Sequence, residues 1–314
     1  MKRSSGFFGF TLFLVILAAG LWLWTPDKPR SELEALYLAK ASDLRDIDGV
    51  RLHLRVQGSP SAPVLIMLHG FGASLHTWDG WAAELDDEFR VIRFDLPGSG
   101  LSYPDPGNDY SDERALQLIC ALMDELAVDR AAFIGNSIGG RLAWRMAATY
   151  PQRVSALVLV SPDGFASKGF EYSKPAEVPY IMNLMRYVLP KHVLRMNLAP
   201  AYADASKLDE AVVTRYHDLM LAPGSRDALL QRLTQTVLVD PQPLLKQISV
   251  AVLLLWGESD RMIPIENAAD YQRVLPDSRL VPLPKLGHVP QEEDPLRSLP
   301  PVRTFLQSAL LPAP

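Results

Sequence analysis

The segment Gly135-Asn136-Ser137-Ile138-Gly139 has the clearest capacity for chemistry in this sequence. It follows the apolar run AAFIG and precedes RLAWRMAATY, a pattern typical of a strand, a tight turn and a helix. A serine at such a turn adopts a strained backbone, so glycines two residues before and after it avoid collisions. The hydroxyl then stands clear of the sheet, next to a helix amino terminus that stabilises negative charge. The spacing predicts that Ser137 is a nucleophile.

A serine nucleophile needs a general base, and that base needs a group that orients it. Among the six histidines, His288 is the best candidate because it follows the last apolar run, on a loop at the carboxyl end of a strand. Three carboxylates remain open as the orienting acid. Asp260 is preferred because it stands at the tip of the loop GESDRMIP, ahead of Asp163 and Glu258.

The elements that must position these residues follow an alternating pattern. Helical stretches are expected near 75–86, 111–127, 138–150, 265–275 and 295–311. Between them run short, almost wholly apolar segments at 64–68, 91–94, 131–135, 154–160, 250–256 and 279–283. Strands without a polar face are typical of a parallel sheet that is covered on both sides. The pattern predicts an α/β domain with a mostly parallel, doubly wound sheet, preceded by a hairpin within 42–58.

The alternation breaks once, between Val160 and Val250, where about 90 residues carry no strand signal. A structureless loop of that length is improbable in a compact domain, so we expect an inserted helical subdomain. We expect residues 1–25 to be an N-terminal membrane anchor or signal sequence, followed by a linker at 26–42. The core comprises 43–162 and 236–314, with the insertion at 163–235.

Composition excludes several classes of protein. The chain has 314 residues, a formal charge of −5 and one cysteine, Cys120. A single cysteine excludes an intrachain disulfide framework and any cysteine-based metal site. The slight acidic excess gives no reason to propose nucleic acid as a partner. We expect no metal and no cofactor.

The N-terminal residues Phe7 to Trp24 form an uncharged apolar run of 18 residues, preceded by Lys2 and Arg3. As a helix the run would span about 27 Å, just enough to cross a bilayer core. We therefore expect a single N-terminal transmembrane helix, an uncleaved signal-anchor with the catalytic domain facing outward into the periplasm or the medium. The small residues Ala18-Ala19-Gly20 leave signal cleavage and secretion open as the alternative.

The order Ser137, Asp260, His288 and five ordered motifs make the chain from about Asp43 to Leu310 resemble the α/β-hydrolase superfamily. The motifs are HGFG at 69–72, DLPGSGLS at 95–102, GNSIGG at 135–140, GESDRMIP at 257–264 and GHVPQEEDP at 287–295. The resemblance implies the α/β-hydrolase fold, with the insertion as a helical cap over the site. It also implies an oxyanion hole formed by the backbone N–H groups of Phe71 and Ile138.

The resemblance also narrows the reaction. Relatives that dehalogenate or open epoxides use aspartate where this chain has Ser137, which disfavours both reactions. We expect hydrolysis of carboxylic esters of small or lipid-like, acyl-chain substrates through an acyl-enzyme. Thioesterase, amidase or acyltransferase activity remains an alternative, as does a membrane-tethered binding protein that keeps the fold without activity.

A further alternative is hydrolysis of carbon–carbon bonds in ring-fission products, because Asn136-Ser137 resembles the elbow of such enzymes. Those relatives usually have tryptophan after the catalytic histidine, where this chain has Val289. They also hold a substrate carboxylate with an arginine, for which Arg186 or Arg195 are the candidates.

Overall fold

The computed structural model describes residue 20, residues 23–166 and residues 171–311. Their core is a sheet of eight strands in the order β1-β2-β4-β3-β5-β6-β7-β8. The strands are β1 (Leu44–Ile47), β2 (Val50–Gln57), β3 (Val64–Leu68), β4 (Arg90–Phe94), β5 (Ala131–Asn136), β6 (Val154–Val160), β7 (Val252–Gly257) and β8 (Ser278–Leu283). Strands β1 and β2 form an antiparallel hairpin at one edge, and β4 to β8 run parallel with β3. The expected α/β class and mostly parallel sheet are confirmed.

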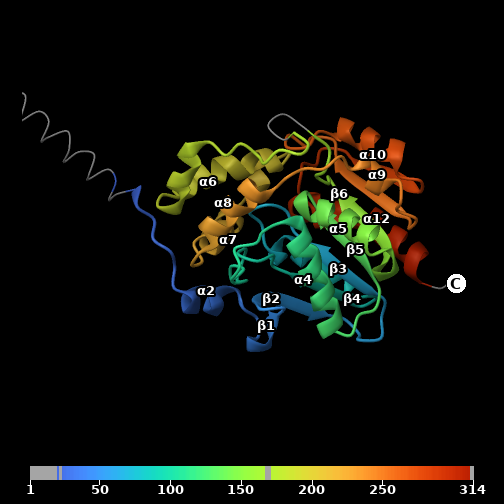
Figure 1. The fold of residues 1–314 in the computed structure, drawn as a ribbon, viewed down its shortest axis with the longest axis horizontal. Coiled ribbons are helices and arrows are strands. Elements are labelled where there is room, and N and C mark those ends of the chain that lie inside the picture. The colour runs from blue at the N-terminus through green and yellow to red at the C-terminus, as the bar shows by residue number, and fades with distance from the viewer. Residues whose placement is uncertain (1–19, 21–22, 167–170, 312–314) are drawn as a thin grey trace, which may run out of the picture.

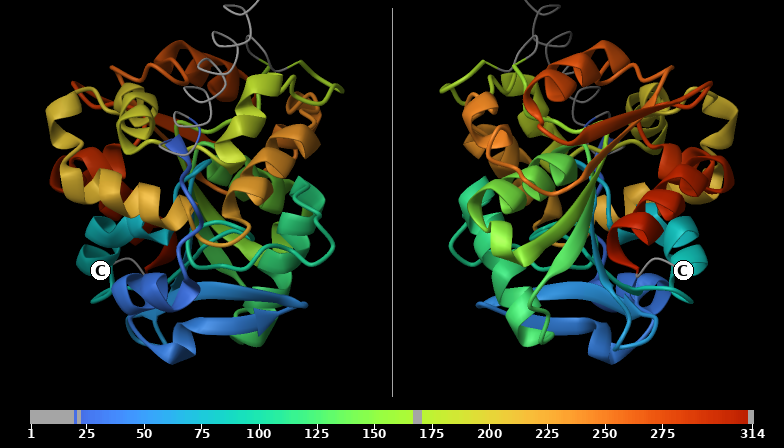
Figure 2. Two further views of the ribbon diagram at one scale, coloured as in Figure 1. Left: turned by 90° about the vertical axis from the view of Figure 1, so that its left-hand side faces the viewer. Right: turned by 90° about the vertical axis from the view of Figure 1, so that its right-hand side faces the viewer.

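Helices cover both faces of the sheet (Figures 1 and 2). Alternate residues of each strand point to opposite faces, so Ile66 and Leu254 pack on one side, and Leu65 and Leu253 on the other. The first side is covered by α4 (Asp112–Glu125), α5 (Ile138–Thr149), α9 (Gln242–Leu245) and α10 (Ala268–Val274). The second side is covered by α3 (Asp79–Leu85) and α12 (Pro295–Leu310). Burial on both faces explains why the strands have no polar side.

Three of the helices between β6 and β7 lie outside the layers that cover the sheet (Figure 1). They are α6 (Lys191–Leu198), α7 (Glu210–Met220) and α8 (Ser225–Gln235), preceded by the 3-10 turn η4 (Tyr180–Arg186). We call these four elements and their connections the helical insertion. Tyr202, Leu208 and Val213 form a small apolar cluster with Val289, which belongs to the sheet domain. This cluster fastens the insertion to the loop that carries His288.

The expectation of an N-terminal transmembrane helix is wrong. Within the described residues, no helix has the length and apolar character needed to cross a membrane. The longest described helix, α12, has 16 residues, which is about 24 Å and short of a bilayer core of about 30 Å. Most of the expected span 7–24 lies outside the described residues. The signal-anchor and the outward-facing, single-pass location are therefore withdrawn.

The described N-terminal part packs onto the body of the protein. Helix α2 (Arg30–Tyr37) buries Leu33 completely in a cluster with Leu101, Leu219 and Ala222. Leu101 belongs to the sheet domain, whereas Leu219 belongs to α7. The segment before β1 therefore contacts both the sheet domain and the insertion.

Because the centre of the sheet is buried on both faces, truncating a side chain there should lower the free energy of unfolding strongly. Leu254 in β7 is completely buried, so Leu254→Ala removes its packing on one face and should lower the free energy of unfolding by about 2–5 kcal/mol. Leu296→Ala is the matched control, because Leu296 is 73% exposed and its truncation should cost about 0.5 kcal/mol or less. Urea unfolding followed by circular dichroism measures both, and equal costs would contradict the assigned core.

Candidate active site

Ser137 occupies a strained turn between β5 and α5. Its backbone has φ +55° and ψ −122°, a conformation that residues other than glycine rarely adopt. A Cβ on Gly135 would lie 2.2 Å from the Gly139 carbonyl oxygen, and a Cβ on Gly139 would lie 2.2 Å from the Leu68 carbonyl oxygen. The turn therefore closes only with glycine at both positions.

His288 and Asp260 meet across a buried hydrogen bond. The Nδ1 of His288 lies 2.7 Å from Oδ2 of Asp260, and both side chains are almost fully buried. The other carboxylate oxygen, Oδ1, accepts backbone N–H bonds from Met262 at 2.8 Å and Ile263 at 2.9 Å. Because a carboxylate only accepts, Nδ1 carries the proton in this bond, which leaves Nε2 available as a base.

The two other candidate acids have different surroundings. The carboxylate of Asp163 pairs with the buried guanidinium of Arg141, which also binds Asp112 at 2.9 Å. Glu258 is exposed at the end of β7. The structure therefore brings Asp260 to His288 and engages Asp163 in an ion-pair network behind the nucleophile.

Ser137 and His288 open into one cavity of about 240 Å³. The sheet domain contributes the loop from Gly70 to Ala73, and the insertion contributes the opposite wall. Most of that wall is apolar, with Met182, Met185, Leu189, Leu194, Leu198, Ala201, Met220 and Leu229. The polar lining residues are Asn136, Ser137, Asn197, Tyr202, Tyr216 and His288, with neither lysine nor arginine in the set.

The two arginines considered for a substrate carboxylate do not line this cavity. Arg186 binds Asp227 at 2.5 Å, and Arg195 binds Glu210 at 3.2 Å and the carbonyl oxygen of Leu208 at 2.8 Å. Both partners are surface carboxylates of the insertion, more than half exposed. Arg186 and Arg195 therefore stabilise the insertion's outer face.

The two residues expected to form the oxyanion hole lie beside the nucleophile. Ile138 is the first residue of α5, so its N–H has no acceptor within the helix. Phe71 lines the cavity on a loop that passes close to the nucleophile, since a Cβ on Gly70 would lie 3.4 Å from Cβ of Ser137. Gly72, at φ +67°, supplies the turn that follows.

Asp95 and His69 form buried hydrogen bonds that support the loop from Gly70 to Ala73. Asp95 accepts from His53 Nδ1 at 2.8 Å and from the backbone N–H of Leu75 at 2.6 Å. Burial favours the neutral acid, but His53, His69 and the Leu75 N–H together keep the pKa of Asp95 below its ordinary value. Burial lowers the pKa of His69, whose neutral ring donates from Nδ1 to the Gly70 carbonyl oxygen at 2.8 Å. These residues support the loop and take no part in the cavity lining.

Two positioning roles were not predicted from the sequence, where Asn136 was noted only as a neighbour of the nucleophile. Asn136 donates from Nδ2 to the carbonyl oxygens of His288 at 2.9 Å and Val160 at 3.1 Å. Buried Glu293 accepts from the N–H groups of Gly287 at 2.7 Å, Asp204 at 2.9 Å and Ala203 at 3.1 Å. Glu293 thereby ties the loop of His288 to the insertion. The only sequence signal was its place in the motif GHVPQEEDP.

A family model described as alpha/beta hydrolase fold matches residues 63–295. The chain belongs to the α/β-hydrolase family. A putative 2-succinyl-6-hydroxy-2,4-cyclohexadiene-1-carboxylate synthase of Bacillus subtilis (strain 168) is 31% identical, covering 79% of this chain and 92% of the relative. A 2-hydroxy-6-oxononadienedioate/2-hydroxy-6-oxononatrienedioate hydrolase of Pseudomonas sp is 28% identical, covering 73% of this chain and 83% of the relative.

The fold of a membrane phospholipase A, titled a novel bacterial virulence factor, superposes with a TM-score of 0.73. It is 24% identical, and the match covers 99% of this α/β-hydrolase and 100% of that chain. The family and the names of the relatives support a hydrolase that acts on a small molecule.

The three hydrogen bonds to Glu293 predict a positioning effect on His288. Glu293→Gln keeps the shape but turns one acceptor into a donor that faces N–H groups, which should cost about 2 kcal/mol of stability. Because the loop of His288 loses its anchor, kcat should fall about tenfold with little change in KM. Thermal unfolding and steady-state kinetics measure the two effects.

Glu258→Gln is the matched control, an exposed glutamate at the end of β7, and it should behave as the wild type. A normal kcat in folded Glu293→Gln would show that the hydrogen bonds of Glu293 do not position His288.

Proposed function

We propose that this α/β-hydrolase cleaves carboxylic esters that carry an apolar acyl chain, with Ser137, His288 and Asp260 as its triad. One observation carries the proposal: Ser137 and His288 open into a largely apolar cavity whose lining holds no cationic side chain. Such a lining favours a neutral substrate with a hydrocarbon part, because apolar burial supplies the binding energy. Residues 163–235 act in this proposal as the cap that closes the cavity.

The proposed reaction proceeds in two acyl-transfer steps. His288 takes the hydroxyl proton of Ser137 through Nε2 while the oxygen attacks the ester carbonyl carbon. Asp260 holds the ring tautomer at 2.7 Å and stabilises the imidazolium. The imidazolium then protonates the leaving alcohol as the acyl-enzyme forms. Water repeats the sequence on the acyl-enzyme, which releases the acid and restores Ser137.

The backbone N–H groups of Phe71 and Ile138 serve in this proposal as the oxyanion hole. They stabilise charge that exists only at the tetrahedral stage, and each such donor contributes about 2.7–4 kcal/mol to lowering the barrier. The amino terminus of α5 adds a favourable field, since Ile138 begins that helix.

Hydrolysis of carbon–carbon bonds in ring-fission products is the second candidate, favoured by the names of the relatives. It would use the same three residues. A dienoate carboxylate, however, needs a cation, whereas Arg186 and Arg195 bind surface carboxylates away from the cavity. Val289 lines the cavity next to His288, at the position where those enzymes usually carry tryptophan.

Removal of the nucleophile tests the mechanism. Ser137→Ala should lower kcat for p-nitrophenyl butyrate by about 10⁴–10⁶-fold while the fold stays intact, because the variant lacks the hydroxyl that attacks the ester carbonyl carbon. Circular dichroism and steady-state kinetics measure this. Ser308→Ala, an exposed serine in α12, is the matched control and should retain wild-type turnover. Turnover near normal in folded Ser137→Ala would overturn the triad.

A substrate panel separates the two candidate reactions. Along p-nitrophenyl esters from acetate to octanoate, kcat/KM should rise about threefold to fourfold for each methylene that the cavity buries. A 2-hydroxy-6-oxo-dienoate should react more slowly than the best ester, because its carboxylate meets no cation in the lining. Faster cleavage of the dienoate would establish the carbon–carbon reaction instead.

A further inference from the structure

The segment Thr25 to Arg30, which we call the strap, crosses from the insertion to the sheet domain. Thr25 donates its N–H to the Tyr187 carbonyl oxygen at 2.8 Å. Its side-chain Oγ1 accepts the N–H of Leu189 at 3.1 Å. Leu189 lines the cavity of Ser137. Thr25 therefore binds the chain just after η4 at two residues, Tyr187 and Leu189, which flank Val188.

Arg226 at the start of α8 joins the strap to the cavity wall. Its buried guanidinium donates to the carbonyl oxygens of Thr25 at 2.8 Å and Met185 at 3.3 Å, and to Oδ1 of Asp27 at 2.5 Å. Met185 lines the cavity of Ser137. One buried cation thus connects the strap and η4.

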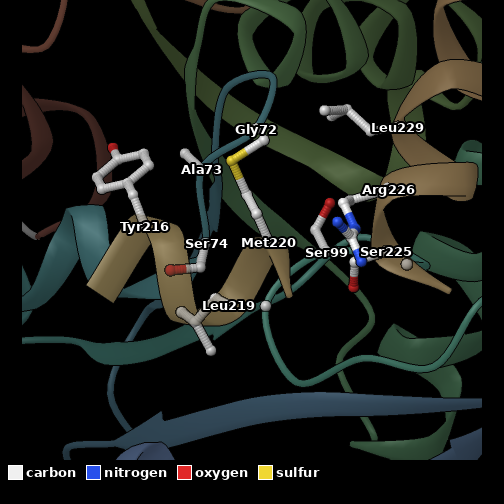
Figure 3. Close-up of a pocket in the computed structure, with 12 residues that line it drawn as sticks. Gly72, Ala73, Ser74, Ser99, Tyr216, Leu219, Met220, Ser225, Arg226 and Leu229 are labelled. Carbon is white, nitrogen blue, oxygen red and sulfur yellow. The ribbon is translucent and has the colours of Figure 1, made fainter. Parts of the chain in front are cut away.

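Arg226 also lies close to the loop beside the nucleophile. It lines a second, small cavity of about 20 Å³ together with Met220, Leu229, Gly72 and Ala73 (Figure 3). These four residues also line the cavity of Ser137, so Arg226 stands one layer of side chains behind it.

The other end of the strap is fixed to both parts of the protein. Lys28 donates its N–H to the Leu221 carbonyl oxygen at 2.8 Å, and its Nζ lies 3.2 Å from Oδ1 of Asp218. Arg30 donates to the Leu101 carbonyl oxygen at 3.1 Å and stacks on the ring of Tyr103 at 3.5 Å. Because Leu101 and Tyr103 belong to the sheet domain, the strap is anchored outside the insertion that it holds.

The turn η4 has little other packing on its outer side. Tyr180, Ile181 and Leu184, and Tyr187 just after the turn, are each more than half exposed. A segment with so few buried apolar contacts opens at low free-energy cost unless polar ties restrain it. The hydrogen bonds of Thr25 and Arg226 supply such ties.

We propose that the strap is a clasp for the active site. It fixes the cavity wall formed by Met185 and Leu189 and thereby sets how well the site accepts longer acyl chains. Arg226 is the positioning residue, and it touches no reacting atom. The chain-length consequence rests on the proposed ester hydrolysis. The clasp itself rests only on the contacts of Thr25, Asp27 and Arg226.

The physical consequence differs between short and long substrates. A butyryl group bound to Ser137 fills only the part of the 240 Å³ cavity nearest the nucleophile. A decanoyl chain needs the wall that the clasp holds. Loosening the clasp should therefore weaken long-chain turnover through KM and leave short-chain kcat unchanged.

The experiment compares p-nitrophenyl butyrate and decanoate in Arg226→Gln, Thr25→Val and Asp27→Ala. For decanoate, kcat/KM should fall about tenfold in Arg226→Gln, the size expected from losing charge-assisted hydrogen bonds. Butyrate should stay within about twofold, because its short chain fills little of the 240 Å³ cavity and depends less on that wall. Arg226→Lys, which keeps the charge, should restore part of the decanoate activity.

Asp227→Asn is the matched control, because Asp227 does not contact the strap and holds η4 only through an exposed ion pair with Arg186, which contributes little. It should behave as the wild type. Equal losses for both substrates in every strap variant, or the same chain-length shift in Asp227→Asn, would overturn the clasp. Thr25→Val and Asp27→Ala decide the matter if Arg226→Gln fails to fold.

Hydrogen exchange provides a readout that does not depend on activity. The Leu189 amide should exchange at least about tenfold faster in Thr25→Val, which removes its acceptor, than in Asp227→Asn. Unchanged exchange would overturn the clasp whatever the substrate is. If the wild type hydrolyses no ester, but the Leu189 amide still exchanges faster in Thr25→Val than in Asp227→Asn, the proposed reaction is refuted and the clasp is retained.

Discussion

The backbone of Ser137 is the constraint on which the rest of the site depends. At φ +55° it lifts the serine side chain off the end of β5 and starts α5 immediately afterwards. Gly135 and Gly139 permit this turn only because neither carries a Cβ. The strain is sustained by the buried centre of the sheet, where β3 and β6 flank β5 in parallel register. A rigid sheet thus presents a strained serine at the carboxyl ends of its strands, where loops from several strands meet.

Those loops are held to one another by buried polar groups. Asn136 binds the carbonyl oxygen of His288, so the residue beside the nucleophile also fixes the loop of the base. Glu293 ties the same loop to Ala203 and Asp204 of the insertion, and the His288 N–H donates to the Ala201 carbonyl oxygen at 2.7 Å. The insertion is therefore coupled to His288, while its outer turn η4 depends on the strap. The apolar cavity thus has one wall from the sheet domain and a second wall, near Met185 and Leu189, that the strap holds in place. Such a cavity suits hydrocarbon substrates of different lengths.

The sheet and the turn at Ser137 were predictable from sequence because their signals are local. Apolar runs fit a buried parallel sheet, and glycine spacing reflects the collisions within one turn. The expected N-terminal transmembrane helix is wrong, because no helix within the described ranges is long and apolar enough to cross a membrane. Arg186 and Arg195 were considered for substrate binding, yet both bind surface carboxylates. Glu293 and Arg226 escaped prediction because they join segments that are far apart in sequence, by about 90 residues for Glu293 and Ala203 and by 201 residues for Arg226 and Thr25.

The most direct test of the central claim is peptide mapping of the protein after reaction with an alkyl fluorophosphonate, which captures an activated serine covalently. The proposed triad predicts one phosphonylated residue, Ser137, and no adduct in a folded His288→Ala variant under the same conditions. Modification at another serine, or undiminished labelling of Ser137 without His288, would contradict the account.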